Sequence, residues 1–171
     1  AWRNGAARVA SEKAIEYAAL ARKLDFQSKL LRLVTDSQRN HILIADTEGR
    51  VRFVNATLAK FMESNSEELI GKPLAAAVGP DAARRLGKRS QEASLSNKAI
   101  VTVDRIALDE TDDSKFRVIQ TQHIPLEDYS AGPDKPPARG MLIVEEDITD
   151  VVMEREKRER VLQAVVGVLV S

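Results

Sequence analysis

The sequence predicts an α+β domain, in which an antiparallel sheet carries short helices on one face, with a further helix at each end of the chain. Three observations lead to this fold class. The first 38 residues contain no Pro and are rich in Ala, Leu, Lys, Arg and Glu, which favours one long helix. Between residues 40 and 145, five short extended runs are divided two and three by a helical section. From residue 151 the pattern is helical again.

Composition excludes several classes of function. Lys and Arg total 26 and Asp and Glu total 26, so the net charge is zero and nothing favours nucleic acid as a partner. The lack of Cys excludes disulfides and thiolate chemistry, and the 2 His leave little material for a metal site or a catalytic triad. No apolar run is long enough to span a membrane. We therefore expect a cytoplasmic protein, attached to a membrane only through a span outside this piece.

The N-terminal segment, residues 1–38, has the spacing of a short coiled coil. Five apolar residues alternate at three and four positions once Gln27 is accepted as a polar member of the series. Such a seam would be exposed in a monomer, so we expect a parallel homodimer. The seam residues are Tyr17, Leu20, Leu24, Leu31 and Val34.

Five strands and three short helices account for the middle of the chain. Asn55 and Ser64 precede helical runs and can cap their first free amide groups. The segment from Tyr129 to Gly140 contains several Pro residues, so we expect an exposed and mobile loop. The expected strands are 41–45, 50–54, 100–108, 116–126 and 141–145, and the expected helices are 56–62, 64–71 and 82–94.

The turn between the third and fourth expected strands, residues 109–114, is acidic. It lacks the Gly and the distant Glu of a calcium-binding loop. We expect a solvated hairpin turn. Its acidic residues are Asp109, Glu110, Asp112 and Asp113.

Four segments carry a resemblance to a known family. In their order and spacing they resemble a PAS domain, a sensory and dimerisation module of bacterial signalling proteins, over roughly residues 38 to 150. The segments are Ile44-Ala45-Asp46 with Gly49, then Arg50 to Asn55, then Glu67 to Lys72, and finally Gly140 to Val144 followed by Asp147-Ile148-Thr149.

The resemblance implies a five-stranded antiparallel sheet in the order two-one-five-four-three, with helices that enclose a small cavity. Together with the helical patterns at the two ends, it gives three expected parts: a coiled-coil-like helix over 1–38, a sensory domain over 39–150, and the start of a signalling helix over 151–171. Asp147 and Thr149 are expected to join the last strand to this helix and to relay the signal.

The implied cavity would be lined mostly by apolar side chains. His123 shares a strand face with Ile119 and Thr121, so it can form a polar end of the cavity, although a partly exposed strand histidine is the favoured interpretation. His41 is expected to have a structural or surface role. The candidate ligand-contacting residues are Phe61, Leu69, Leu86, Val103, Ile119, Thr121, His123 and Ile143.

The sequence lacks the residues with which similar domains hold haem or flavin, and it contains one basic cluster. Similar domains that hold haem use a His on the long helix after the middle motif, and residues 82–97 contain none. Flavin-binding relatives carry a core Trp or a reactive Cys, and the single Trp is Trp2. We expect neither haem nor flavin. A basic cluster on that helix can bind a carboxylate ligand or a partner, although a solvated surface is favoured; it comprises Arg84, Arg85, Lys88 and Arg89.

These observations favour a noncatalytic sensory and dimerisation domain that passes a small-molecule or partner signal to an output domain. The chain neither begins with Met nor completes its last helix, so we expect a piece of a longer protein. An output domain such as a cyclic-dinucleotide phosphodiesterase, a cyclase or a kinase would follow. The alternative is a structural interaction module whose core is filled by its own side chains. An enzyme is disfavoured because no acid, base or nucleophile is suitably paired.

Overall fold

The computed structural model describes residues 2–128, 134 and 138–170. The chain forms two compact units, residues 1–38 and residues 39–171. The first unit is one helix, α1 (Trp2–Asp36). The side chains of the expected seam, from Tyr17 to Val34, are between 51% and 72% exposed, so an isolated copy of the helix leaves the whole seam uncovered.

The second unit is built on a five-stranded antiparallel sheet. The strands follow the order β2-β1-β5-β4-β3, which confirms the fold class predicted from the sequence. The first two strands form a hairpin, and β5 lies between β1 and β4 at the centre of the sheet. The strands are β1 (His41–Ala45), β2 (Val51–Val54), β3 (Ile100–Ala107), β4 (Phe116–Asp128) and β5 (Ala138–Asp147).

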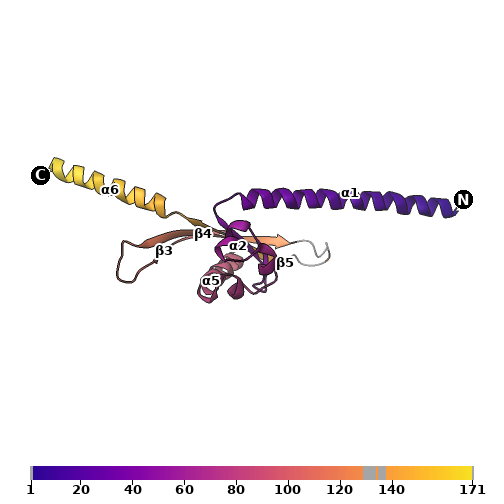
Figure 1. Cartoon of the computed structure of the whole chain (residues 1–171), viewed down its shortest axis with the longest axis horizontal. Helices are drawn as coiled ribbons and strands as arrows, with labels where there is room; N and C mark the ends of the chain where they lie inside the picture. The colour runs from indigo at the N-terminus through magenta and orange to yellow at the C-terminus, as the bar shows by residue number, and fades with distance from the viewer. Residues whose placement is uncertain (1, 129–133, 135–137, 171) are drawn as a thin grey trace. The chain divides into compact units, whose positions relative to one another are not determined.

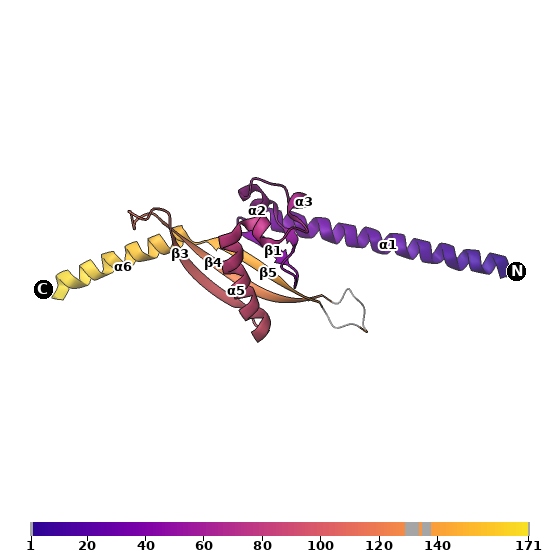
Figure 2. The same cartoon turned by 90° about the horizontal axis from the view of Figure 1, so that it is seen from below.

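Four helices separate β2 from β3, where the sequence analysis expected three. Figure 1 shows α2 and α5 on the same side of the sheet, and Figure 2 shows α5 running across it. The unexpected helix, α4, is a single turn that starts after Pro73 without a capping side chain. The helices are α2 (Ala56–Phe61), α3 (Ser66–Leu69), α4 (Leu74–Val78) and α5 (Pro80–Ser96).

The hairpin and the first short helix are fixed by two polar side chains. Asp46 Oδ1 accepts hydrogen bonds from the backbone N–H groups of Glu48 and Arg50, which closes the turn, and Gly49 takes the positive φ of 72° that this turn requires. Asn55 is fully buried and caps α2 by accepting a hydrogen bond from the N–H of Leu58. Both residues lie where the sequence predicted a turn and a cap.

The hydrophobic core lies between the sheet and these helices. Side chains that alternate along β1, β2 and β5 meet the inward faces of α2, α3, α4 and α5. The buried cluster is Leu43, Ala45, Val51, Val54, Leu58, Ala59, Leu69, Ala77, Leu86, Ala93, Met141 and Ile143.

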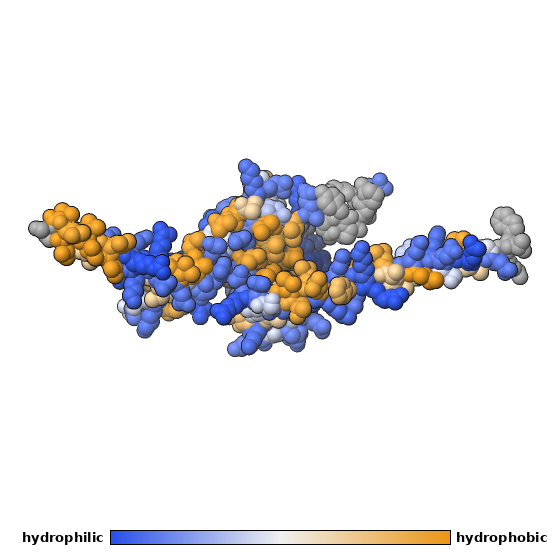
Figure 3. All heavy atoms as spheres, turned by 90° about the horizontal axis from the view of Figure 1, so that it is seen from above, coloured by the Kyte–Doolittle hydropathy of each residue, from blue (hydrophilic) through white to orange (hydrophobic). Residues whose placement is uncertain are grey.

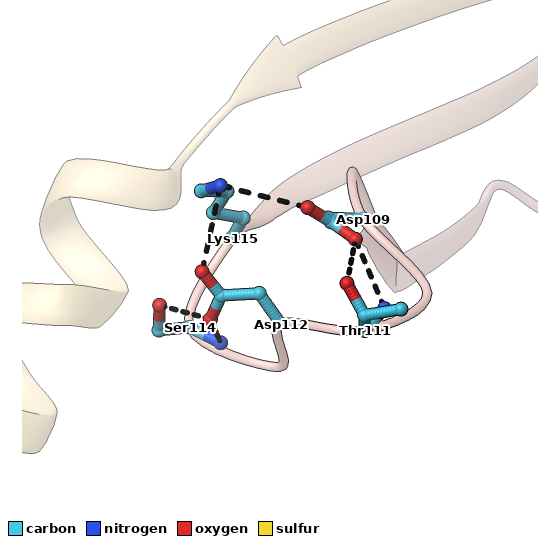
Figure 4. Close-up of polar contacts among 5 residues, drawn as sticks. All are labelled: Asp109, Thr111, Asp112, Ser114 and Lys115. Atoms are coloured by element: carbon cyan, nitrogen blue, oxygen red, sulfur yellow. Dashed lines mark hydrogen bonds and ion pairs between the residues drawn. The ribbon is translucent and has the colours of Figure 1, made fainter.

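The acidic turn between β3 and β4 folds on its own hydrogen bonds (Figure 4). Asp109 Oδ1 accepts from the N–H and the hydroxyl of Thr111, at 2.9 and 2.7 Å. Asp112 accepts in the same way from Ser114, and Lys115 Nζ lies 3.5 Å from an oxygen of each aspartate. These bonds lower the pKa of both aspartates, chiefly through the hydroxyl donors. Most of the expected Pro-rich loop lies outside the described residues, and residues 138–140 belong to β5.

The second unit ends in helix α6 (Thr149–Val170). Most of its apolar side chains are exposed, including Leu162 at 63% and Val166 at 56%, and Figure 3 shows hydrophobic residues gathered toward the C-terminal end of this helix. Among the residues that the structure describes, no helix combines the length and the hydrophobicity needed to cross a membrane.

Candidate functional site

A cavity of about 420 Å³ opens between the sheet and helices α2, α4 and α5. This volume falls within the range of roughly 300 to 1,000 Å³ that is typical of small-molecule sites. Its apolar wall comes from the helices and from the inward faces of β3 and β4. The apolar wall comprises Leu58, Phe61, Met62, Val78, Ala82, Leu86, Ile106, Leu108 and Ile119.

One side of the cavity is lined by ionisable groups, which we call the charged end. The strand register brings them together, because His41 pairs with Glu145 across β1 and β5, and Ile119 pairs with Asp147 across β4 and β5. Arg85 reaches the same place from α5. The charged end comprises Arg39, His41, Arg85, Arg117, Glu145 and Asp147.

The ion pairs at the charged end are loose. Arg85 Nη2 lies 3.8 Å from Glu145 Oε1, and Arg117 Nε lies 3.8 Å from Asp147 Oδ2. These distances are too long for hydrogen bonds. Within the described part of the chain, Glu145 Oε1 is buried and has no hydrogen-bond partner. The arginines and carboxylates therefore attract one another, but their donors and acceptors remain available to hydrogen-bond a bound molecule.

His41 belongs to the charged end and contacts the apolar wall at Phe61. Its ring centroid lies 4.8 Å from that of Phe61, which is 59% exposed. Partial burial lowers the pKa of His41, Glu145 and Asp147 raise it, and Arg117 lowers it. The net lowering favours a neutral imidazole at neutral pH. His41 was expected to be structural or at the surface, and it lies instead in the lining of this cavity.

The candidate ligand-contacting residues fall into three groups. Phe61, Leu86 and Ile119 line the cavity. Val103 is 57% exposed, because it alternates along β3 with Ile106, which points to the cavity in its place. The remaining candidates are buried in the core outside the lining of this cavity, and they are Leu69, Thr121, His123 and Ile143.

His123 is fully buried, so the favoured interpretation of a partly exposed histidine was wrong. Its Nδ1 lies 3.2 Å from Ser90 Oγ, which links β4 to α5, and in the described residues its Nε2 has no hydrogen-bond partner. Burial lowers the pKa of His123, Arg89 lowers it further, and Asp104 and Glu92 raise it. A neutral histidine that connects sheet to helix is a structural element of the core.

The basic cluster on α5 does not act as one surface. Arg85 lines the cavity, whereas Arg84 pairs with Asp81 at 3.0 Å and Arg89 pairs with Glu92 at 3.3 Å. Sequence reasoning missed Arg39, Arg117 and Glu145 altogether. Only the register of β1, β4 and β5 brings these three side chains to one cavity, and single residues carry no signal of that register.

A second cavity, of about 410 Å³, lies beside the C-terminal half of α5. Its lining combines polar groups, such as Ser90 and Ser94, with apolar side chains, such as Leu74, Leu95 and Met141. None of its lining residues belongs to the charged end or to the start of α6. The first cavity is therefore the better candidate for a site that influences helix α6.

The junction between β5 and α6, residues 147–149, is held by hydrogen bonds to β4. Ile148 N–H donates to the carbonyl of Val118 at 2.9 Å, and Val118 N–H donates to Thr149 Oγ1 at 2.9 Å. Thr149 in turn donates to Asp147 through both its N–H, at 3.0 Å, and its hydroxyl. These two donors, with Arg117 nearby, lower the pKa of Asp147 below its usual value, the hydroxyl having the larger effect.

The cavity and the junction share Asp147, and a second cavity residue, Arg117, adjoins the junction. Asp147 accepts the hydrogen bonds that start α6, and it also lines the charged end. Arg117, which also lines the charged end, lies beside Val118, the β4 residue that bonds both Ile148 and Thr149. The charged end is therefore in direct contact with the groups that hold the start of α6.

Comparison with solved structures supports this architecture. The PAS domain of Bordetella pertussis BvgS is 20% identical, with a TM-score of 0.52, and the match covers 82% of this chain and 98% of that domain. The phage VqmA–DPO complex is 17% identical, with a TM-score of 0.53, over 88% of this chain and 63% of VqmA. A PAS domain from Colwellia psychrerythraea is 17% identical, with a TM-score of 0.50, over 74% of this chain and 98% of its own length. At these identities the likeness concerns the fold.

Sequence comparison identifies the family. A search of curated proteins found no match. The family model described as the PAS fold matches residues 35–152, which is more than half of the chain and includes the whole sheet, the cavity and the junction. The chain therefore belongs to the PAS family.

Proposed function

We propose that this chain is a noncatalytic sensory domain that couples its cavity to helix α6, and through α6 to an output domain in the full-length protein. The observation that carries the proposal is that Arg117 and Asp147 belong to the lining of the cavity while adjoining or forming the junction. A cavity of about 420 Å³ also favours a ligand over a core filled by its own side chains.

The relay follows from the chemistry of the charged end. A ligand that pairs with Arg117 weakens its attraction to Asp147, which changes the balance of forces on the carboxylate that starts α6. The helix then leaves the sheet at a different angle or rotation, as in other switches built on a shift of a rigid element. A coupling free energy of about 1 to 3 kcal/mol is enough for such a relay.

We further propose that the domain works as a parallel homodimer through α1. The supporting observation is the exposed seam between Tyr17 and Val34, whose spacing suits a two-stranded coiled coil. A dimer would place two copies of α6 in one assembly, so a change in the angle at which α6 leaves the sheet would act on both output domains.

The domain is proposed to hold neither haem nor flavin. His123, which is fully buried, is bonded to Ser90, and His41 packs against Phe61 in a cavity with charged groups. The purified chain is expected to be colourless. An absorbance band in the haem or flavin region that survives dialysis would contradict this.

The relay is tested by Thr149→Val in a protein that keeps its output domain. This substitution preserves side-chain shape and removes the hydroxyl that bonds Val118 N–H and Asp147, at a cost on the order of 1 to 3 kcal/mol in the junction. Thr149 does not line the cavity, so ligand binding is retained. Output activity is expected to lose its response to the input.

The matched control is Thr111→Val in the β3–β4 turn. Thr111 makes the same pair of hydrogen bonds to Asp109 that Thr149 makes to Asp147, but these bonds stay within the β3–β4 turn. This variant is expected to respond normally. If Thr149→Val responds with normal amplitude as well, the junction is only a connector and the proposed relay is wrong.

A further inference from the structure

The charged end carries more positive than negative groups. Three guanidinium groups face two carboxylates, and each carboxylate is already shared with one arginine, Glu145 with Arg85 and Asp147 with Arg117. Among the described residues, Arg39 has no carboxylate within ion-pair distance. The low pKa of His41 keeps its ring neutral at neutral pH, so it adds no further charge. One positive charge is left for a ligand to neutralise.

The charged end offers both hydrogen-bond donors and a hydrogen-bond acceptor to a ligand. The side chains of Arg85 and Arg117 are 40% and 52% exposed. Each lies 3.8 Å from its carboxylate oxygen, which is too far for a hydrogen bond. A planar guanidinium fork is well suited to the two oxygens of a carboxylate. Glu145 Oε1 is the opposite case, because it is a buried acceptor that lacks a donor within the described residues. A complementary ligand therefore supplies both an anionic acceptor and a neighbouring donor.

The rest of the cavity lining is apolar. This wall is formed by Leu, Ile, Val, Met, Ala and Phe side chains, including Leu58, Met62 and Ile106. Burial of hydrocarbon against such a wall stabilises a complex by about 25 cal/mol per Å² of apolar surface removed from water. An inorganic anion would gain nothing from it.

We propose that the cavity binds an apolar monocarboxylic acid that carries a hydroxyl group next to its carboxylate. The carboxylate lies on the guanidinium groups of Arg85 and Arg117, the hydroxyl donates to Glu145, and the hydrocarbon body fills the apolar wall. This inference rests on the proposed function, in which this cavity receives the input.

The test is isothermal titration of the purified chain with three probes that share a phenylpropyl body. Phenyllactate has both the carboxylate and the hydroxyl, phenylpropanoate has the carboxylate alone, and phenylpropylamine has a cation. Phenyllactate is expected to bind saturably, phenylpropanoate several-fold more weakly, and phenylpropylamine not at all. If phenylpropylamine binds as tightly as phenyllactate, or if neither acid saturates at millimolar concentration, the proposal is wrong.

Variants separate the charged end from charge on the molecule as a whole. Arg85→Gln is expected to weaken phenyllactate binding about tenfold or more, since a charge-assisted pair is lost. Arg84→Gln removes the same charge from the adjacent position of α5, where the side chain is 79% exposed and pairs with Asp81, and it is expected to leave binding unchanged. Equal losses in the two variants would reduce the effect to net charge and overturn the proposal.

Glu145→Gln gives a prediction of opposite sign. It removes the negative charge beside Arg85 and retains an acceptor oxygen, so phenylpropanoate is expected to bind more tightly than to the unmodified chain. A cation site would be weakened by the same change, and weaker phenylpropanoate binding would contradict the assignment. Circular dichroism of each variant checks that it is folded.

Failure of this inference can be distinguished from failure of the relay. The titrations use the isolated chain and need no output domain, whereas Thr149→Val is scored by output activity. If the acids do not bind but Thr149→Val abolishes the response, the ligand class is wrong and the relay stands. If the acids bind as expected but Thr149→Val responds normally, the ligand class stands and the relay is wrong.

Discussion

Asn55 connects three parts of residues 39–171, the proposed sensory unit, through one buried side chain. Its Oδ1 accepts from Leu58 N–H and from Ile42 N–H, both at 3.1 Å, and its Nδ2 donates to the carbonyl of Asn40 at 2.8 Å. The side chain thus caps α2 and at the same time fixes the start of β1, where His41 enters the cavity. The residue that caps α2 therefore also positions His41 in the lining of the cavity.

Asn55→Ala is expected to lower the free energy of unfolding by about 2 to 4 kcal/mol, because backbone groups on two elements lose partners in a buried place. Asn65→Ala is the matched control. Asn65 caps α3 with one bond, to Glu68 N–H at 2.9 Å, at an exposed position, so its loss is expected to cost about 1 kcal/mol. Chemical denaturation followed by circular dichroism gives both values. Equal costs would mean that the bonds of Asn55 to β1 contribute nothing.

Residue-level patterns predicted roles that depend on local sequence and missed those that depend on register. The caps at Asn55 and the turn at Asp46 follow from their immediate neighbours. Val103 was chosen for the cavity on hydrophobicity alone, and the alternation of β3 turned it outward. Glu145 was not chosen because a charged residue near the end of a strand looks solvated until its partner strand is known.

At the scale of elements, the long periodic helices and the apolar strands were predictable, while short elements were not. α1 and α5 have enough residues for a helical period to be recognised. α4 has five residues and no capping side chain, so its sequence carries no start signal. β5 runs from Ala138 to Asp147, beyond the apolar run that marked it, because pairing with β4 extends it with polar residues at both ends.

The α1 seam gives a prediction about assembly. Replacing Leu24 and Leu31 by Glu places like charges at the centre of the proposed dimer contact, so the chain is expected to become a monomer while the sensory unit stays folded. Phe26→Glu with Leu33→Glu is the control, since these residues are equally exposed, at 66% and 69%, and lie two positions after each seam residue, away from the contact. Sedimentation velocity separates the outcomes. A dimer that persists in the seam variant would rule out α1 as the main contact.

At the scale of the whole sensory unit, helix α6 is held to the sheet at two places. The junction bonds its first turn to Val118 on β4. Arg105 on β3 reaches α6 further along and pairs with Glu156 at 2.9 Å, while its guanidinium lies 3.5 Å from the ring of Phe116. The second contact is partly exposed, at 50% and 39%, so its contribution to stability is at most about 1 kcal/mol. A contact of this size is weak for folding but large enough to bias the exit angle of a helix.

Exchanging the charges of this pair tests whether it sets the resting state of the output. Arg105→Glu and Glu156→Arg, each alone, place like charges together and are expected to shift basal output activity by roughly two- to fivefold, the population change that 0.5 to 1 kcal/mol produces. The double variant restores an opposite-charge pair and is expected to return activity toward its original level. The control is the same exchange at Arg155 and Glu159, which pair with each other at 3.0 Å within α6 and are 79% and 55% exposed. Basal activity that stays constant in both single variants, or a double variant that shows only the sum of two single effects, would mean that α6 is oriented by the junction alone.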